Sequence, residues 1–358
     1  MPKTWRGALI GAGHVALEGH LPGWSSRRDV AIAAATDARG EARGAVSAAL
    51  PQAVWHDSLE SLLSSEPLEF LDICTPPDAH GAAILAGLER GLHVLCEKPL
   101  VLDREELVRL KTLSEERGLV LASVHNWKHA PGLERAGALV RQGAIGRVRN
   151  VVWEVTRTEP SAAAPAAGAS NWRLDPSRSG GGILVDHGWH AVYMAATWLA
   201  GRLRSVSGRL ETRKHHRWPV EDTADVRLAF DGGDARLFLT WAGEERRNRV
   251  TIEGTAGTIR IDGASLELET GREEASRREY APSLSDGSHH PDWFAGVADD
   301  FVSAMSRGRA SASLAEAAVC LEAILLAQES SRRGGKRIQA FASGRDLAGV
   351  AAGRGGGR

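Results

Sequence analysis

The sequence has few cysteines, no long apolar run and almost no net charge. Cys74, Cys96 and Cys320 stand apart in apolar surroundings, which excludes a disulfide framework and indicates buried thiols in a reducing compartment. No run approaches the roughly 18 apolar residues of a membrane span. The 44 basic and 45 acidic side chains nearly cancel, so no overall field favours nucleic acid or an anionic membrane. Without a signal-peptide pattern at its N-terminus, we expect a cytoplasmic protein with neither of these partners.

Two domains are expected from 358 residues with 43% hydrophobic and 25% charged residues. In residues 1–125, short apolar segments alternate with helical patterns. The predicted strands are residues 7–10, 30–36, 69–74, 92–96 and 119–124, and the predicted helices are 14–27, one ending at 50, 78–90 and 103–117. This alternation predicts a Rossmann-type, doubly wound parallel sheet that binds a dinucleotide.

Residues 126–342 follow a different pattern, because consecutive strands are separated by short turns. We predict strands at 148–158, 203–214, 223–230, 235–241, 249–253, 258–261 and 265–269, and helices at 292–306 and 314–330. They indicate an α/β domain with a large, mostly antiparallel sheet. Because few helices follow, we expect one apolar face to stay uncovered and to form a homodimer or homotetramer. The Ala-rich segment 161–168 reads as an irregular insertion near the substrate side, and residues 343–358 as a flexible tail.

The first motif is a glycine-rich turn after the first strand. Gly11-Ala12-Gly13-His14-Val15-Ala16 opens a helix, with Gly11 suited to the tight turn and Gly13 to the approach of a pyrophosphate. Asp37 ends the second strand and would bind the ribose hydroxyls of NAD. NADP stays an alternative, because Arg39 and Arg43 could bind its 2′-phosphate. An ordinary glycine turn with a capping Asp is the structural alternative.

Two further segments end parallel strands, at the edge where open sheets bind ligands. Thr75-Pro76 begins the turn before His80, which we interpret mainly as a structural helix residue that could also touch the cofactor. Glu97-Lys98-Pro99 ends the next strand. A surface ion pair would be the ordinary interpretation, but a lysine here can relay protons near a nicotinamide ribose.

A glycine loop, Gly180-Gly181-Gly182, precedes an apolar helix in the second domain. Asp186 and His190 are four residues apart and would share one face of that helix. Imidazole titrates near neutrality, so His190 can accept a hydroxyl proton. A structural Asp–His pair is the alternative. No group of residues has convincing metal-ligand spacing, so no metal is expected.

These motifs resemble the Gfo/Idh/MocA family of oxidoreductases over nearly the whole chain. The segments that carry the resemblance are Gly11-Ala12-Gly13, Cys96-Glu97-Lys98-Pro99-Leu100, Trp172-Arg173-Leu174-Asp175-Pro176, Gly180-Gly181-Gly182, Asp186-x-Gly188-x-His190, Val220-Glu221-Asp222-Thr223-Ala224 and Glu253-Gly254-Thr255-Ala256-Gly257. The resemblance implies a Rossmann domain, a second domain whose open sheet forms oligomers, and a Lys-Pro bond that is often cis. It implies catalytic roles for Lys98 and His190, with Asp186 orienting the substrate or the base.

The site expected from motifs and resemblance together has three parts. The catalytic residues are Lys98, Asp186 and His190. The cofactor-binding residues are Gly11, Gly13, His14, Val15, Ala16, Asp37, Thr75, Pro76, His80, Glu97 and Lys98. The substrate-binding residues are Lys98, Trp127, Lys128, Trp172, Arg173, Asp186 and His190. Of the 11 tryptophans, we expect one or two among Trp127, Trp153, Trp172, Trp189 and Trp218 to line the substrate pocket, because indole rings stack on sugars.

The reaction that we expect is NAD-dependent oxidation of a ring secondary alcohol of a sugar, cyclitol or related polyol to a ketone. An NAD-dependent hydrolase or lyase that oxidises its substrate transiently is one alternative. A nonenzymatic ligand sensor with the same fold is the other, although a sensor needs no Lys98, Asp186 and His190.

Overall fold

The computed structural model describes residues 3–161, 171–271 and 273–341. The insertion expected at 161–168, apart from Ser161, and the tail at 343–358 lie outside these residues. Contacts divide the chain into two compact units. The first holds the chain up to Asn126, Trp172 and Ser288–Ala317, and the second holds Trp127–Ser161, Arg173–Gly287 and the chain from Ala318. This division differs from the predicted domains, because it assigns residues 288–317 to the first unit.

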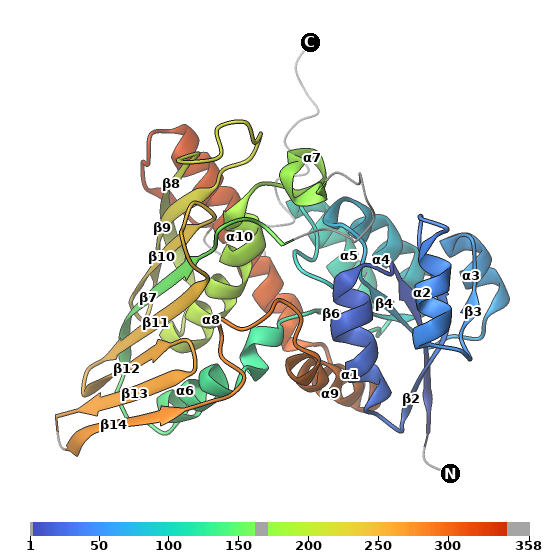
Figure 1. Ribbon diagram of the computed structural model, residues 1–358, viewed down its shortest axis with the longest axis horizontal. Helices are drawn as coiled ribbons and strands as arrows, with labels where there is room; N and C mark the ends of the chain where they lie inside the picture. The colour runs from blue at the N-terminus through green and yellow to red at the C-terminus, as the bar shows by residue number, and fades with distance from the viewer. Residues whose placement is uncertain (1–2, 162–170, 272, 342–358) are drawn as a thin grey trace. The chain divides into compact units, whose positions relative to one another are not determined.

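The first unit contains a six-stranded parallel sheet of order β3-β2-β1-β4-β5-β6 (Figure 1). Its strands are β1 (Trp5–Ile10), β2 (Val30–Thr36), β3 (Val54–Trp55), β4 (Phe70–Ile73), β5 (His93–Cys96) and β6 (Leu121–Ser123). Its helical segments are the π-helical η1 (Val15–His20), the 3-10 helix η2 (Pro77–Ala79), α1 (Leu21–Ser25), α2 (Ala42–Ala49), α3 (Leu59–Ser65), α4 (His80–Glu89), α5 (Arg104–Glu116) and α9 (Pro291–Arg307). The predicted doubly wound sheet is confirmed.

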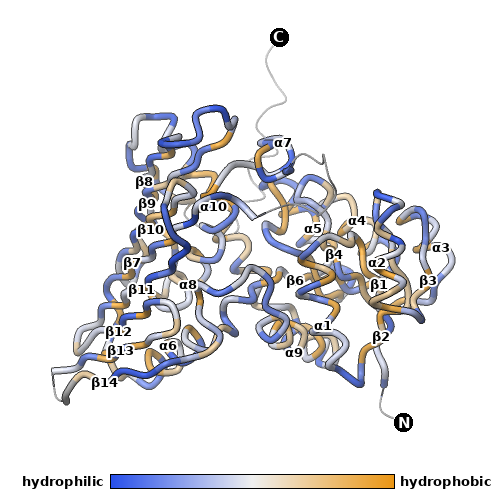
Figure 2. Tube along the Cα trace, viewed as in Figure 1, coloured by the Kyte–Doolittle hydropathy of each residue, from blue (hydrophilic) through white to orange (hydrophobic). Residues whose placement is uncertain are grey.

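Apolar strands explain why this sheet is buried on both faces. All four residues of β4 are buried, as a parallel strand between two helical layers requires. Figure 2 shows hydrophobic residues along β1, β4 and β6. Helix α9 belongs to this unit because Phe294 and Phe301 join one core cluster with Trp24 and Phe70.

The second unit contains a nine-stranded sheet of order β14-β13-β12-β11-β7-β10-β9-β8-β15. The strands are β7 (Val148–Thr156), β8 (Leu203–Glu211), β9 (Thr223–Phe230), β10 (Asp234–Thr240), β11 (Arg247–Gly254), β12 (Gly257–Asp262), β13 (Ser265–Thr270), β14 (Glu273–Glu279) and β15 (Ile338–Gln339). All pairs are antiparallel except β7 with β10. The predicted mostly antiparallel sheet is therefore confirmed.

Helices α6 (Pro131–Arg141), α8 (Trp189–Leu199) and α10 (Ala312–Arg332) cover one face of this sheet (Figure 1). Within the described ranges, no helix covers the other face. Short helical segments complete the chain: η3 (Asn126–His129), η4 (Trp172–Leu174), α7 (Pro176–Ser179) and the π-helical η5 (Leu184–Gly188). In the part of the chain that the structure describes, no helix is both long and apolar enough to span a bilayer.

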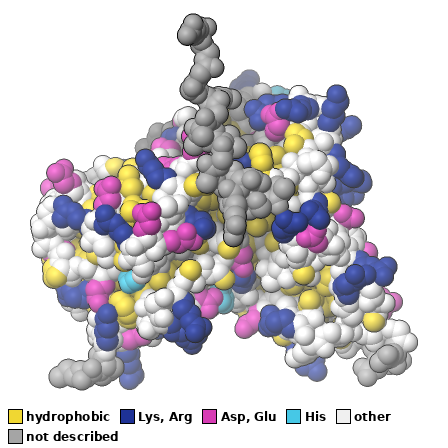
Figure 3. Space-filling model, turned by 180° about the vertical axis from the view of Figure 1, so that it is seen from behind, with side chains coloured by type: hydrophobic (Ala, Val, Ile, Leu, Met, Phe, Trp, Pro, Cys, Tyr) yellow, Lys and Arg dark blue, Asp and Glu magenta, His cyan; other side chains and the backbone are white. Residues whose placement is uncertain are grey.

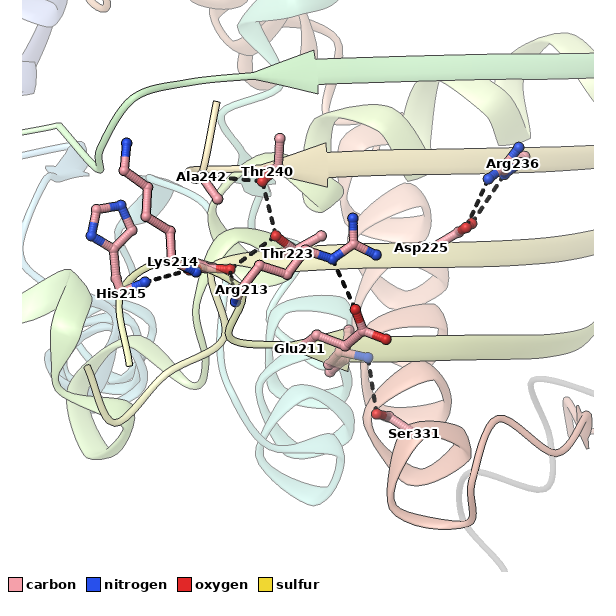
Figure 4. Close-up of polar contacts among 12 residues, drawn as sticks. Glu211, Arg213, Lys214, His215, Thr223, Asp225, Arg236, Thr240, Ala242 and Ser331 are labelled. Atoms are coloured by element: carbon pink, nitrogen blue, oxygen red, sulfur yellow. Dashed lines mark hydrogen bonds and ion pairs between the residues drawn. The ribbon is translucent and has the colours of Figure 1, made fainter. Parts of the chain in front are cut away.

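The uncovered face carries charged side chains that the expectation of an apolar face did not include. Along β9 and β10, buried residues such as Val226 and Leu237 alternate with residues that point outward. Arg236 and Asp225 both point outward, and the Arg236 guanidinium donates to the Asp225 carboxylate at 3.0 and 2.8 Å (Figure 4). Arg249 and Glu154 pair similarly across β11 and β7 at 3.4 Å. Period-two alternation brings charged side chains to the face opposite the helices. The open face therefore carries ion pairs beside apolar side chains such as Val152 and Phe238.

Candidate active site

The glycine turn lies between β1 and the π-helical turn η1. Gly11 has φ +91°, and a Cβ there would come within 2.7 Å of the backbone nitrogen of Thr75, so only glycine fits. A Cβ on Gly13 would meet nothing within 4 Å, which leaves the backbone open to a ligand such as pyrophosphate. Of the other predicted residues here, Ala16 is fully buried and His14 makes an edge contact with His289.

Asp37 follows β2 and faces the glycine turn. Its carboxylate accepts a hydrogen bond of 2.7 Å from the backbone nitrogen of Ala12 and one of 2.8 Å from that of Arg39. The Arg39 guanidinium also donates to it, at 3.0 and 3.1 Å. Burial opposes ionisation, but these bonds hold the pKa of Asp37 below its ordinary value. An anionic acceptor therefore stands where ribose hydroxyls are expected, and it holds Arg39, the residue that could bind a 2′-phosphate.

His80 ties together the two loops that follow β4 and β5. Its ring is fully buried, with Nδ1 2.8 Å from the carbonyl oxygen of Pro99 and Nε2 2.7 Å from that of Thr75. Burial lowers the pKa of this imidazole and outweighs the two carbonyl contacts, which raise it. Because both nitrogens face backbone carbonyls, the geometry supports the structural interpretation of His80.

The Thr75 hydroxyl is a different case. Its Oγ1 is buried, and no hydrogen-bond partner stands within the described parts of the chain. Such an orphaned polar atom, next to the backbone that Gly11 approaches, fits a bound cofactor. Pro76 begins the short turn that leads into η2.

Glu97 and Lys98 follow β5 directly, and the Lys98–Pro99 peptide bond is cis. Glu97 points into the protein, where its carboxylate lies 3.1 Å from Nε2 of His20 and accepts a 2.9 Å bond from the backbone nitrogen of Lys98. Asp72 lies on the other side of His20. His20 and Asp72 were not among the predicted site residues, although Asp72 is a charged residue inside the apolar strand β4.

In the second unit, His190 lies in the first turn of α8 and is 6% exposed. Its Nδ1 is 2.9 Å from the hydroxyl oxygen of Tyr193, and its ring stacks on Trp127 with a centroid distance of 4.8 Å. The Trp127 backbone nitrogen donates to the same hydroxyl at 3.2 Å. Tyr193 and Trp127 therefore fix the plane of the His190 ring. Tyr193, three residues after His190, was not predicted.

Asp186 does not share a regular α-helix with His190. It lies in the π-helical η5, which leads directly into α8, so a π-helical turn replaces the start of the regular α-helix that the spacing predicted. Its carboxylate lies 3.8 Å from Nε of Arg173 and 3.8 Å from Nε2 of His187. Arg157 is 2% exposed. Burial lowers the pKa of Arg157 to about 9, and the nearby charge of Asp186 partly offsets this shift. Asp186 is thus an anion among basic groups.

Glu221 and the glycine loop position the start of this helical segment. The Glu221 carboxylate accepts bonds from the backbone nitrogens of Gly182, at 2.9 Å, and Leu184, at 3.2 Å. A Cβ on Gly182 would lie 1.9 Å from the Glu221 carbonyl oxygen, so glycine is required. Next to it, the Asp222 carboxylate accepts bonds of 2.8–2.9 Å from the backbone nitrogens of Arg213, Lys214 and His215. This segment is one of those that carry the family resemblance, but its hydrogen bonds could not be predicted from the sequence.

Strand ends beside this segment are joined by hydroxyl groups. Thr223 Oγ1 is 2.9 Å from Thr240 Oγ1, which accepts a 3.0 Å bond from the backbone nitrogen of Ala242 (Figure 4). Together with the bonds to Asp222, they fix the connection that carries Glu221.

The other predicted substrate residues divide between the units. Lys128 lies in η3 and is partly exposed. Trp172 falls in the first unit and Arg173 in the second. Trp153 and Trp189 are buried core residues, and Trp218 stacks on His215 with a centroid distance of 3.7 Å. The structure thus places Lys98 in the first unit, and Asp186 and His190 in the second.

Comparison with known proteins agrees with both halves of this description. A family model described as an oxidoreductase family with an NAD-binding Rossmann fold matches residues 5–125. A second model, the GFO/IDH/MocA C-terminal domain, matches residues 133–260.

Two curated relatives and one solved structure are similar to the chain. A dTDP-3,4-didehydro-2,6-dideoxy-alpha-D-glucose 3-reductase of Streptomyces antibioticus is 30% identical, over 85% of this chain and 89% of that protein. Levoglucosan dehydrogenase of Pseudarthrobacter phenanthrenivorans is 28% identical over 62% of this chain, which spans about half, 53%, of that protein. A structure of levoglucosan dehydrogenase with NADH and levoglucosan is 21% identical with a TM-score of 0.83, over 94% of this chain and all of that one, and shows the shared fold.

The predicted resemblance is confirmed, and the relatives include enzymes named as sugar dehydrogenases and reductases. The chain belongs to the Gfo/Idh/MocA family of oxidoreductases, and its first domain is the NAD-binding Rossmann fold of that family.

Proposed function

We propose that this protein interconverts a ring secondary alcohol and the corresponding ketone of a sugar, cyclitol or related polyol, with NAD as the hydride acceptor. The family makes it an oxidoreductase. The roles of individual residues and the kind of substrate are inferences from the chemistry of the side chains.

One chain of contacts within the first unit carries the proposal. Gly11 of the dinucleotide turn closely approaches the backbone of Thr75. Thr75 is joined through the His80 ring to Pro99, at 2.7 and 2.8 Å. Lys98 directly precedes Pro99. The lysine therefore belongs to the same group of loops as the glycine turn, at the carboxyl edge of the sheet where dinucleotides bind.

We assign the cofactor to the residues that fit it. The open backbone at Gly13 would receive the pyrophosphate at a helix N-terminus, Asp37 the adenosine ribose, and the orphaned Thr75 hydroxyl a further polar group. When bound, NAD supplies the hydride acceptor. The bond between Asp37 and Arg39 favours NAD, because the carboxylate repels a 2′-phosphate; NADP remains the alternative.

We assign proton transfer to Lys98 and His190. A lysine ammonium can donate to the substrate oxygen and to a ribose hydroxyl, while an imidazole can accept the hydroxyl proton near neutral pH. The support for His190 is its fixed ring, held by Tyr193 and stacked on Trp127. The carboxylate of Asp186 would accept hydrogen bonds from substrate hydroxyl groups and orient the substrate. In this proposal, Lys98 and His190 act as one coupled unit in proton transfer.

The class of substrate follows from the relatives and from the polar character of the Asp186 surroundings. The named relatives act on a deoxysugar nucleotide and on levoglucosan. In this chain, Asp186 with Arg173 and His187 offers both acceptors and donors, which suits a molecule with several hydroxyl groups.

The test is a screen of sugars, cyclitols, amino sugars and nucleotide sugars with NAD and with NADP, followed by NADH absorbance. We expect stoichiometric NADH from at least one polyol. A product formed without net NADH would instead indicate a hydrolase or lyase that regenerates its cofactor. Binding of sugars without any turnover would indicate a sensor.

A further inference from the structure

A chain of charged side chains lies beneath Lys98, within the first unit. Nδ1 of His20 is 3.0 Å from both carboxylate oxygens of Asp72, and Nε2 is 3.1 Å from Oε1 of Glu97. His20 is 1% exposed and Asp72 is fully buried. The indole N–H of Trp24 donates to Asp72 at 2.7 Å. The proposed function uses Lys98 but leaves this chain without a role.

The geometry fixes the protonation of His20. A neutral imidazole has one N–H, so its second nitrogen would direct a lone pair at a carboxylate. Two carboxylates on opposite nitrogens therefore require an imidazolium that donates to both. Burial disfavours this charge, but the contacts with Asp72 and Cys74 together raise the pKa of His20 well above its usual value. Burial raises the pKa of Cys74, 3.1 Å from Nδ1, to about 12, so Cys74 is a neutral thiol.

Glu97 links the His20 imidazolium to the backbone of Lys98. Oε2 of Glu97 accepts a 2.9 Å bond from the backbone nitrogen of Lys98, while Oε1 faces His20. Burial opposes ionisation of Glu97, but His20 and Lys98 hold its pKa below the ordinary value. Because one carboxylate bonds both groups, the position of the lysine backbone depends on the imidazolium.

We infer that His20 is a positioning residue for Lys98: a buried cation that bridges Asp72 and Glu97 and keeps Glu97 anionic and fixed under the Lys98 turn. This inference rests on the proposed function, because it gives His20 a part in that reaction. Phe294 of α9 stacks on the His20 ring at 3.9 Å and holds it between the two carboxylates.

The composition of this cluster also suits a metal, because ligand atoms of His20, Asp72 and Cys74 lie within 4.8 Å of one another. A metal-bound histidine must present a lone pair on the bound nitrogen. Here both nitrogens face carboxylates, and Asp72 already accepts the Trp24 N–H. The contacts therefore describe an ion-paired chain.

The first test needs no substrate. Nitrogen-15 NMR of the imidazole rings, with His20 assigned by comparison with His20→Asn, should show both His20 nitrogens protonated at neutral pH. A signal from one unprotonated His20 nitrogen would overturn the inference. Since this readout is independent of turnover, failure of the proposed function cannot be mistaken for failure of this inference.

The second test measures coupling to Lys98. In the wild-type background, His20→Asn and Glu97→Gln should each lower kcat about tenfold, with a smaller effect on KM, because a misplaced proton donor acts in the transition state. His20→Gln, whose amide can still donate toward Glu97, should recover part of this loss. In the Lys98→Ala background, His20→Asn should cause no further loss.

His56→Gln is the matched control. His56 is also buried, and within the described residues its ring contacts Ser61 at 3.3 Å and Glu66 at 3.5 Å, not the Lys98 turn. Its kcat should stay within about twofold of wild type. Equal losses from His20→Asn with and without Lys98, or equal losses from His56→Gln and His20→Asn, would contradict the inference, because either would indicate a general folding defect. If His20→Asn does not fold, Glu97→Gln alone decides: wild-type kcat would contradict it.

Discussion

Glu221 holds Gly182 through two contacts: its carboxylate accepts the Gly182 backbone N–H at 2.9 Å, and its carbonyl oxygen occupies the place where a Cβ of residue 182 would stand. This relationship fixes the start of the helical segment that carries Asp186 and His190. It explains the glycine loop by close approach of two backbones.

Gly182→Ala should therefore destabilise the protein by about 1–3 kcal/mol, the usual range for overpacking a buried position. Gly44→Ala is the control, because a Cβ there meets nothing within 4 Å and alanine favours the helix α2. Urea unfolding of both variants is the measurement. Equal stability of Gly182→Ala and wild type would show that the loop adapts and that glycine is not required.

NAD should bind more tightly than NADP. The Asp37 carboxylate, ionised and held by the Ala12 N–H, would repel a 2′-phosphate at the end of β2. Asp37→Ala should weaken NAD binding and leave Arg39 to attract NADP. Calorimetric titration of both cofactors against both proteins tests this, and tighter NADP binding by the wild type would reverse the assignment.

Stability should depend on Asp222 in a defined pH range. Burial opposes ionisation, but bonds from three backbone N–H groups and from Thr223 lower the pKa of Asp222 below 3.8. A lowered pKa means that its stabilisation is complete above the unfolded value and is lost as pH falls through the folded value. Asp222→Asn should therefore cost about 1–3 kcal/mol at pH 7 and less near pH 3. A difference that stays constant between these pH values would contradict the ionic role.

We predict a homo-oligomer built on the open sheet of the second unit. This face carries ion pairs such as Arg236–Asp225 beside apolar side chains. On the face of the molecule that Figure 3 shows, basic and acidic side chains are also interspersed. An association through charged pairs should weaken with salt. Sedimentation at low and high salt tests it; a 38.2 kDa monomer in both would refute it.

The alternation of short apolar strands and helices was enough to predict the parallel sheet of the first unit, and consecutive strands with short turns predicted the sheet of the second. Strands β2 (Val30–Thr36) and β9 (Thr223–Phe230) match the predicted limits, and Asp103 caps α5 by accepting a 2.9 Å bond from the Glu106 nitrogen. The missed strands and α-helices are β3, α3, α6, α7, β14 and β15. β3 has two residues, too few for a periodic pattern.

The contacts that organise the candidate site could not be predicted, since they join residues far apart in the sequence. His20 meets Asp72 across 52 positions and Glu97 across 77. Local pattern identifies Lys98 and His190 as reactive residue types, but it carries no information about which carboxylates or hydroxyls face them. The π-helical form of η5 was equally hidden, because its sequence reads as an ordinary apolar helix.

The most direct measurement is steady-state kinetics of Lys98→Ala, His190→Ala and the double variant on a substrate found in the screen, beside NAD titrations. Each single variant should lower kcat by about 10²-fold or more, the scale of a positioned acid–base group. The double variant should be little worse, because members of one proton relay act non-additively. NAD affinity should change little, since in the proposed site the Gly11 turn and Asp37 would bind most of the cofactor. Normal turnover by both single variants would contradict the account and show that the reaction takes place elsewhere in the protein.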